Sequence, residues 1–122
     1  MKFYSCSECK SIFTFIKEPQ DQLQCCNQPL KELIPGTSDA SKEKHVPVVT
    51  QVGQQVTVKV GSLPHPMIPE HYIEWIILET SHGYQLKNLT PNDAPEAEFI
   101  LSKNETIKNC YAYCNIHYLW KS

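Results

Sequence analysis

Hydrophobic and polar residues alternate along several short stretches of the chain, which is typical of β-strands. Residues 56–60 alternate valine with threonine and lysine. Residues 72–78 and 83–86 are two further hydrophobic stretches, and a short polar turn separates them. This spacing predicts a β-hairpin.

Two more hydrophobic stretches, residues 99–101 and 107–113, continue the strand pattern toward the C-terminal end. No stretch shows sustained helical periodicity with capping residues. Short strands divided by turn residues are typical of an antiparallel sandwich or barrel. The pattern therefore predicts a mostly β fold.

The N-terminal segment differs from the rest of the chain. It holds four of the six cysteines and few large apolar residues, and residues 12–16 are its one β-like stretch. A segment with so small a core needs a metal clip for stability. Residues 35–42 contain Pro-Gly and small polar residues, which is typical of a linker. We therefore expect two domains, at residues 1–36 and 37–122.

Composition and charge exclude two classes of partner. The formal net charge is -2, and the basic residues are spread along the chain, so there is no basic stripe for a phosphate backbone. The longest run of large apolar residues, 75–78, is far shorter than the roughly 20 that cross a bilayer. The N-terminal residues lack the apolar region of a signal peptide. We expect a cytoplasmic protein with no nucleic-acid or membrane partner.

Four cysteines near the N-terminus have the spacing of a metal site. Cys6 and Cys9 form a C-x-x-C pair, and Cys25 and Cys26 are adjacent. A disulfide between adjacent cysteines is strained, but two thiolates can face one ion. Four sulfur ligands select iron or zinc, and the spacing does not separate these metals. The alternatives are free buried thiols and a redox-active C-x-x-C, although the latter belongs near a βαβ pattern that this sequence lacks.

Four of the five histidines and a fifth cysteine lie in three short segments of the second domain. These residues are His45, His65, His71, Cys114 and His117. A single histidine is more often a surface or core residue than a ligand, but this grouping favours ligands. Five ligands exceed the four of an ordinary zinc site, and imidazoles with one thiolate suit a redox metal such as iron. An octahedral ion would keep one position open for a small anion, within reach of Glu43 and Lys44.

The three segments carry a family resemblance. They read E-K-H-V-P at residues 43–47, H-P-M-I-P-E-H-Y-I-E-W at 65–75 and C-N-I-H at 114–117, and C-x-x-C with a later C-C precedes them. This combination resembles desulfoferrodoxin, the family of superoxide reductases with two metal centres, over essentially the whole chain. The resemblance implies a desulforedoxin-like first domain and a neelaredoxin-like second domain, which is an immunoglobulin-like antiparallel β-sandwich.

The resemblance also implies the ligands of two irons. The catalytic iron would have four equatorial imidazoles and an axial thiolate, which the motifs place on His45, His65, His71, His117 and Cys114. The second would be a rubredoxin-like iron, with zinc as the alternative metal, on Cys6, Cys9, Cys25 and Cys26.

The activity that the resemblance implies is the one-electron reduction of superoxide to hydrogen peroxide, by a homodimer that receives electrons from a rubredoxin-like carrier. Lys44 would attract the anion and help to protonate the developing peroxide, and Glu43 would ligate the oxidised iron after product release. The chain departs from the family where glycine is common, at Lys10 after the second cysteine and at Tyr118 after His117. We expect the turn geometry to differ at both places.

Two other functions remain open on the sequence. In a non-enzymatic electron carrier or a zinc-stabilised binding module, the cysteine site would act alone and the histidines would be incidental, but the E-K-H-V-P and C-N-I-H segments argue against this. A reductase for another small oxidant would keep the same fold and metal. Outside the two sites, we expect Cys110 to be a small buried hydrophobic residue and His82 to be an exposed turn residue.

Overall fold

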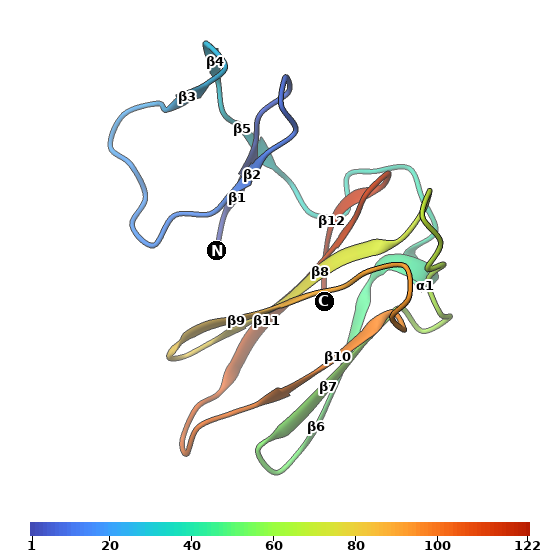
Figure 1. Cartoon of the computed structure of the whole chain (residues 1–122). Coiled ribbons are helices and arrows are strands. Elements are labelled where there is room, and N and C mark those ends of the chain that lie inside the picture. The colour runs from blue at the N-terminus through green and yellow to red at the C-terminus, as the bar shows by residue number, and fades with distance from the viewer. The chain divides into compact units, whose positions relative to one another are not determined.

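The computed structural model describes residues 1–122, which form two compact units, Met1–Ile34 and Pro35–Ser122. Almost all of the regular structure is β-strand (Figure 1). The single helix, α1 (Lys42–His45), is one turn long, and no helix here could span a bilayer. Four residues are too few for a periodic pattern, so the hydrophobic pattern did not predict this helix.

The first unit consists of short strands joined by turns. Its strands are β1 (Phe3–Ser5), β2 (Ile12–Phe13), β3 (Gln24–Cys25), β4 (Gln28–Pro29) and β5 (Lys31–Leu33). They pair antiparallel in the orders β2-β1-β5 and β3-β4. The β-like stretch at residues 12–16 forms a strand only over its first two residues. Phe3 and Cys6 are the only buried residues of this unit, so apolar packing alone gives it little stability.

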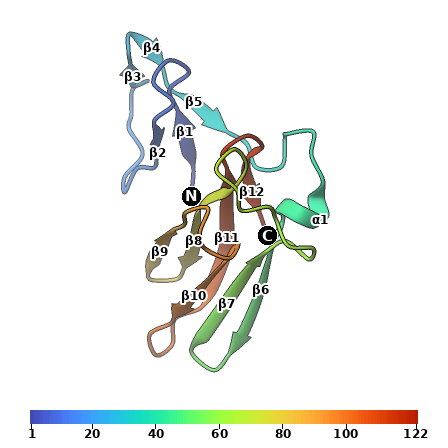
Figure 2. The ribbon, with the colours of Figure 1, turned by 45° about the vertical axis from the view of Figure 1, so that its right-hand side comes forward.

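The second unit consists of two antiparallel sheets. Its strands are β6 (Pro47–Val52), β7 (Gln55–Val60), β8 (Ile73–Thr80), β9 (Gly83–Asn88), β10 (Glu96–Ile100), β11 (Ile107–Cys114) and β12 (Tyr118–Lys121). The sheet orders are β10-β7-β6 and β12-β11-β8-β9. Figure 2 shows these sheets as two layers. The predicted mostly β fold with an antiparallel sandwich is confirmed.

Side chains from both sheets form the core of the second unit. Val56, Val58 and Val60 of β7 are fully buried, as their alternation with polar residues predicted. They belong to one cluster with Ile76 and Leu78 of β8, which come from the opposite sheet. Each such buried side chain contributes about 2 kcal/mol of hydrophobic stabilisation. The second unit therefore has a continuous apolar core of its own.

The predicted hairpin is present as β8 and β9. Thr80 pairs with Gly83, so the turn lies at Ser81 and His82. Strands β6 and β12 were not predicted. The only buried residue of β6 is its first, Pro47, so the strand lacks the alternation that marks a half-buried strand. Strand β12 is short and buries two consecutive residues.

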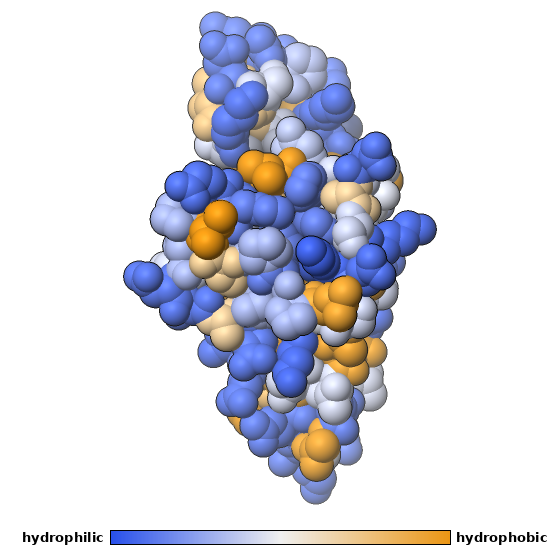
Figure 3. Space-filling model, turned by 90° about the vertical axis from the view of Figure 1, so that its right-hand side faces the viewer, coloured by the Kyte–Doolittle hydropathy of each residue, from blue (hydrophilic) through white to orange (hydrophobic).

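Exposed apolar side chains do not form one surface on the face shown in Figure 3. There, hydrophobic residues (orange) lie in separate small groups among hydrophilic ones. Scattered apolar residues of this kind are ordinary on a protein surface.

Candidate metal centres

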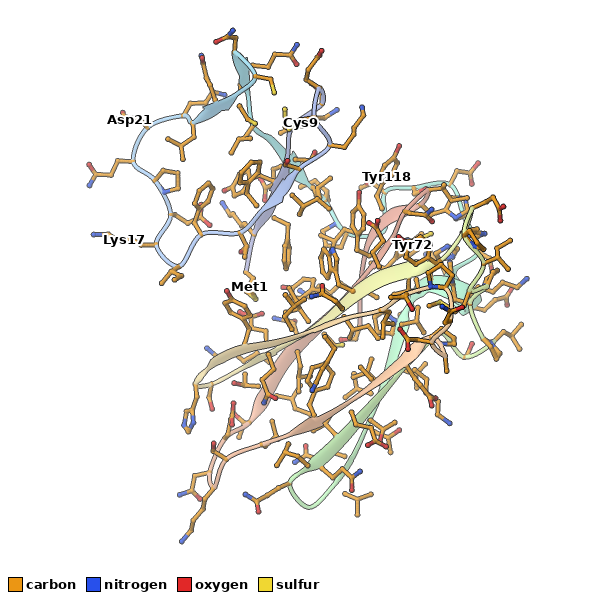
Figure 4. The ribbon with its side chains drawn as sticks, viewed as in Figure 1. Met1, Cys9, Lys17, Asp21, Tyr72 and Tyr118 are labelled. Carbon is orange, nitrogen blue, oxygen red and sulfur yellow. The ribbon has the colours of Figure 1, made fainter.

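Four cysteine sulfurs meet in the first unit. Cys6 and Cys9 lie in the turn after β1, Cys25 ends β3, and Cys26 begins the turn to β4; Figure 4 labels Cys9. The four Sγ atoms lie within 4.8 Å of one another. Cys9 Sγ is 3.6 Å from Cys25 Sγ, which is 4.0 Å from Cys26 Sγ. Four thiolates about 2.3 Å from one ion in a tetrahedron are about 3.8 Å apart, so the cluster fits a tetrahedral metal.

The acidity of these thiols also favours a bound cation. Hydrogen bonds from Ser11 lower the pKa of Cys9 to about 6. The neighbouring Cys9 and Cys6 thiols raise the pKa of Cys25 to about 12, and Cys6 raises that of Cys26. One thiolate forms readily, but its charge opposes the next ones. A metal ion at the centre of the cluster removes this conflict.

The two residues that stand where the family commonly has glycine adopt the backbone conformation that glycine favours. Lys10 and Tyr118 both have a φ of 63°, in the left-handed region. Both residues thus take the conformation that glycine takes freely. A side chain in this region costs roughly 1 kcal/mol.

Four imidazole rings in the second unit form a square. In the order His45, His65, His71 and His117, neighbouring ring centres are 4.5 to 5.0 Å apart, and neighbouring planes meet at 79° to 84°. His45 and His71 are opposite each other at 6.2 Å. Cys114 Sγ lies within 4.8 Å of ligand nitrogens of His45, His65 and His71, and it is 3.9 Å from His117 Nδ1. The structure thus brings together all five side chains that the sequence singled out.

Hydrogen bonds show which nitrogens of two histidines carry a proton. His45 Nδ1 is 2.6 Å from the carbonyl oxygen of Ser41, and His65 Nδ1 is 2.7 Å from that of Pro66. A carbonyl oxygen can only accept, so each Nδ1 carries hydrogen and each Nε2 presents a lone pair. Burial lowers the pKa of both rings, that of His65 to about 4, so both are neutral at pH 7. The two Nε2 atoms are 3.1 Å apart, and two lone pairs at this distance need a cation between them.

The spacing of the nitrogens fits ligands of one ion. Two nitrogens about 2.1 Å from an ion and at right angles are about 3.0 Å apart. His45 Nε2 is 3.1 Å from His65 Nε2 and 3.0 Å from His117 Nδ1. His71 Nε2 is buried without a hydrogen-bond partner. Buried nitrogens are rarely left unpaired, so this atom fits a metal ligand.

The ligands come from the ends of regular elements and the turns beside them. His45 is the last residue of α1, and Cys114 is the last residue of β11. His117 lies in the turn before β12, and His65 lies in the turn after β7. His71 is held by a β-bridge to Ile68. The sandwich therefore places all five ligands at one of its ends.

Asn115 links two of the ligand-bearing segments. Its Oδ1 accepts a hydrogen bond from the amide of Tyr72 at 3.0 Å, and its Nδ2 donates to the carbonyl of Glu70 at 3.1 Å. Tyr72 is labelled in Figure 4. His71 lies between these two residues, so Asn115 ties its segment to the turn that carries Cys114. This explains why the C-N-I-H segment has an asparagine after the cysteine.

Trp120 contacts two of the histidine ligands. Its indole Nε1 donates to the carbonyl of His117 at 3.0 Å, and its ring centre is 4.8 Å from that of His45. The side chain is buried. This role could not be found from the sequence, where the only signal was the position of Trp120 three residues after His117.

Cys114 is buried in the same core that supports the ligands. Burial raises the pKa of its thiol, and the backbone amides of Ile116 and His117 lower it. A neighbouring metal ion would offset the cost of burying the thiolate.

Glu43 and Lys44 lie on α1 directly before His45, and both side chains are exposed. Burial is the main cause that lowers the pKa of His45 and of His71, and the positive charge of Lys44 contributes to both. Lys44 is thus close enough for its charge to be felt at the histidine centre. Glu43 Oε1 accepts a hydrogen bond from the Ser41 hydroxyl at 3.2 Å.

Two other residues lie outside both centres. Cys110 is a free thiol, fully buried in the hydrophobic core, and His82 is exposed in the β8–β9 turn. Both agree with the expectation from the sequence.

Comparisons with known proteins agree with this arrangement. The sequence model of the desulfoferrodoxin family matches residues 37–122. A desulfoferrodoxin homologue of Archaeoglobus fulgidus is 44% identical over 122 residues, which cover 100% of this chain and 96% of that protein. The solved superoxide reductase of Treponema pallidum is 39% identical, with a TM-score of 0.81 over 98% of both chains.

A one-iron superoxide reductase of Giardia intestinalis is 32% identical, with a TM-score of 0.57 over 66% of this chain and 96% of its own. The donor clusters of the present chain, one of four cysteines and one of histidines with a cysteine, match the two iron centres that the resemblance implies. From its sequence, its fold and its ligand clusters, the chain belongs to the desulfoferrodoxin family.

Proposed function

We propose that this protein is a superoxide reductase, which adds one electron and two protons to superoxide and releases hydrogen peroxide. The observation that carries the proposal is the square of four histidine rings with the Cys114 sulfur beside it. Five such ligands leave a sixth position of an octahedral ion for a small anion. The solved relatives described as superoxide reductases support this choice of substrate.

Iron held by these ligands would supply the electron, and the Cys114 thiolate would increase the electron density available to the substrate. Lys44 would attract the superoxide anion, because its positive charge helps to lower the pKa of His45 and His71 and so acts at the centre. The same ammonium group stabilises negative charge that develops on the substrate and can donate one of the two protons. These two roles make Lys44 a catalytic residue.

Glu43 acts after the reaction. Its exposed carboxylate precedes the buried His45 by two residues. Once hydrogen peroxide has left, this carboxylate would be available to take the sixth ligand position of an oxidised iron. A carboxylate at this position would protect the oxidised centre from other anions.

The remaining parts of the proposal rest on the resemblance to the family. Residues 1–36 form a desulforedoxin-like domain with an iron on its four cysteines, or zinc in its place, and residues 37–122 form the neelaredoxin-like catalytic domain. The protein works as a cytoplasmic homodimer and receives electrons from a small rubredoxin-like carrier. It has no nucleic-acid or membrane partner.

Metal analysis with a visible spectrum of protein from iron-replete cells tests the proposal. We expect iron in the histidine centre and a thiolate-to-iron charge-transfer band in the oxidised protein. Zinc in the cysteine cluster with no metal at the histidines would contradict the proposal and favour a binding module. Iron in the cysteine cluster alone would favour an electron carrier.

A further inference from the structure

The backbone of Glu43 is held by the turn that carries one of the histidine ligands. In this turn, residues 60–65, the amide of Leu63 donates to the carbonyl oxygen of Glu43 at 2.9 Å, and the hydroxyl of Ser62 donates to the same oxygen at 3.2 Å. The amide of His65 closes the turn on the carbonyl of Val60 at 2.8 Å. One carbonyl of α1 thus accepts two hydrogen bonds from the segment that leads to His65.

Gly61 packs against the same carbonyl group, and there is no space for a side chain at this position. A Cβ atom added to Gly61 would lie 2.5 Å from the oxygen of Glu43 and 3.0 Å from the carbonyl carbon of Lys44. Ordinary contact begins at 3.4 Å, so the backbone of α1 would have to move by about 0.9 Å. Both contacts are with main-chain atoms, which cannot rotate away as a side chain can.

We infer that Gly61, Ser62 and the amide of Leu63 form a seat that positions Glu43 and Lys44 at the metal centre. This inference rests on the catalytic roles proposed above for these two residues. Both side chains are exposed, so the main chain largely decides where they point. A misplacement of about 1 Å can cost about a hundredfold in rate.

The metal ligands also have contacts of their own outside this seat. His45 is held by the carbonyl of Ser41 and by the ring of Trp120. His65 is held by the carbonyl of Pro66. Loss of the seat should therefore displace the exposed catalytic pair more than the ligands, and the iron should stay bound.

The test is Gly61→Ala in the full-length, iron-loaded protein. We expect unchanged iron content, a rate of superoxide reduction about tenfold lower, and a weaker dependence of that rate on salt. We also expect its oxidised spectrum to resemble that of Glu43→Ala. Ser62→Ala, which removes one hydrogen bond without a clash, should change the rate in the same direction by about twofold to fivefold. If Gly61→Ala fails to fold, the iron content, rate, salt dependence and oxidised spectrum of Ser62→Ala test the inference in its place.

Gly53→Ala is the matched control. Gly53 lies between β6 and β7 with a φ of 60°, and no atom lies within 4 Å of an added Cβ. Alanine there strains the backbone without touching α1, so rate and spectrum should stay unchanged.

A double-variant experiment separates the seat from the proposed function. If the seat acts through Lys44, adding Gly61→Ala to Lys44→Ala should slow the reaction little further. A Lys44→Ala protein with the wild-type rate would contradict the catalytic role itself. Lys44→Ala could be slow while Gly61→Ala and Ser62→Ala keep wild-type rates and spectra. This result would overturn the seat and leave the proposed function standing.

Discussion

The two metal centres are built in opposite ways. The cysteine cluster lies in a unit whose only buried residues are Phe3 and Cys6. The histidine centre lies at the end of a sandwich with a continuous apolar core, to which its ligand Cys114 belongs. The first unit has little but its metal to stabilise it, whereas the second unit can fold first and bind its metal afterwards.

This difference matches the chemistry proposed for each centre. Four thiolates complete a tetrahedral metal, which suits a structural or electron-transfer site. Four imidazoles and one thiolate would leave one coordination position of an octahedral ion open, and no further ligand helps to hold the geometry of this position. The fold keeps it with contacts behind the ligands, including those of Asn115 and Trp120.

The largest effect is expected when one ligand is removed from each centre. Cys25→Ser should unfold residues 1–34, because metal binding in small sites of this kind contributes roughly 10 kcal/mol to folding. The sandwich and its iron should remain. His71→Ala, the matched variant, should weaken iron binding and leave the sandwich folded. Limited proteolysis would detect the unfolded segment, and metal analysis would detect the loss of iron. Equal unfolding of both variants would contradict the difference between the two units.

The next largest effect concerns Cys114. Cys114→Ser should abolish the thiolate-to-iron charge-transfer band of the histidine centre while the absorption of the cysteine cluster persists. The visible spectrum of the oxidised protein measures both bands. Persistence of the histidine-centre band would show that another residue is the axial ligand.

Lys44→Ala should lower the rate of superoxide reduction about tenfold and weaken its dependence on salt, because an attractive charge at the open position is lost. The metal content should not change. Lys103→Ala, an exposed lysine in the turn before β11, is the control for net charge and should keep the wild-type rate. Stopped-flow kinetics at several salt concentrations make the comparison, and unchanged kinetics for Lys44→Ala would exclude the steering role.

A smaller effect is expected at Trp120. Trp120→Phe keeps an aromatic ring beside His45 but removes the hydrogen bond to the carbonyl of His117. We expect a loss of about 1 kcal/mol in the free energy of unfolding and a shift of the histidine-centre band. Denaturant unfolding and the visible spectrum test this, and a wild-type spectrum would mean that the hydrogen bond does not position His117.

The smallest effect concerns the strained turn at Tyr118. Tyr118→Ala and Tyr118→Gly both remove the ring, which packs 6.5 Å from that of Tyr113, but only glycine relieves the left-handed conformation. The glycine variant should be the more stable by about 1 kcal/mol. Equal stability of the two in denaturant unfolding would show that this φ is not strained.

Much of the fold could be predicted from the sequence where strands follow a simple period. The valines of β7 and the β8–β9 hairpin have that pattern, and the structure confirms both. Strands β6 and β12 lack it, because their burial depends on the edges of sheets that a local pattern does not describe. Helix α1 is too short to have a period.

The ligands could be singled out because sulfur and imidazole are scarce and their spacing is informative. The residues that position them could not be found in this way. Gly61, Asn115 and Trp120 act through contacts with backbone atoms far along the chain or across a turn, and no local pattern reveals such contacts. The left-handed conformation of Lys10 and Tyr118 was also hidden, since it follows from the turns on either side.

Rapid mixing of the reduced protein with superoxide tests the central claim most directly. If the histidine centre is a superoxide reductase, its oxidised charge-transfer band should appear at a rate proportional to the superoxide concentration. Hydrogen peroxide should form without dioxygen, because each superoxide ion gains an electron and none loses one. A spectrum that superoxide does not change, or the release of dioxygen, would contradict the account.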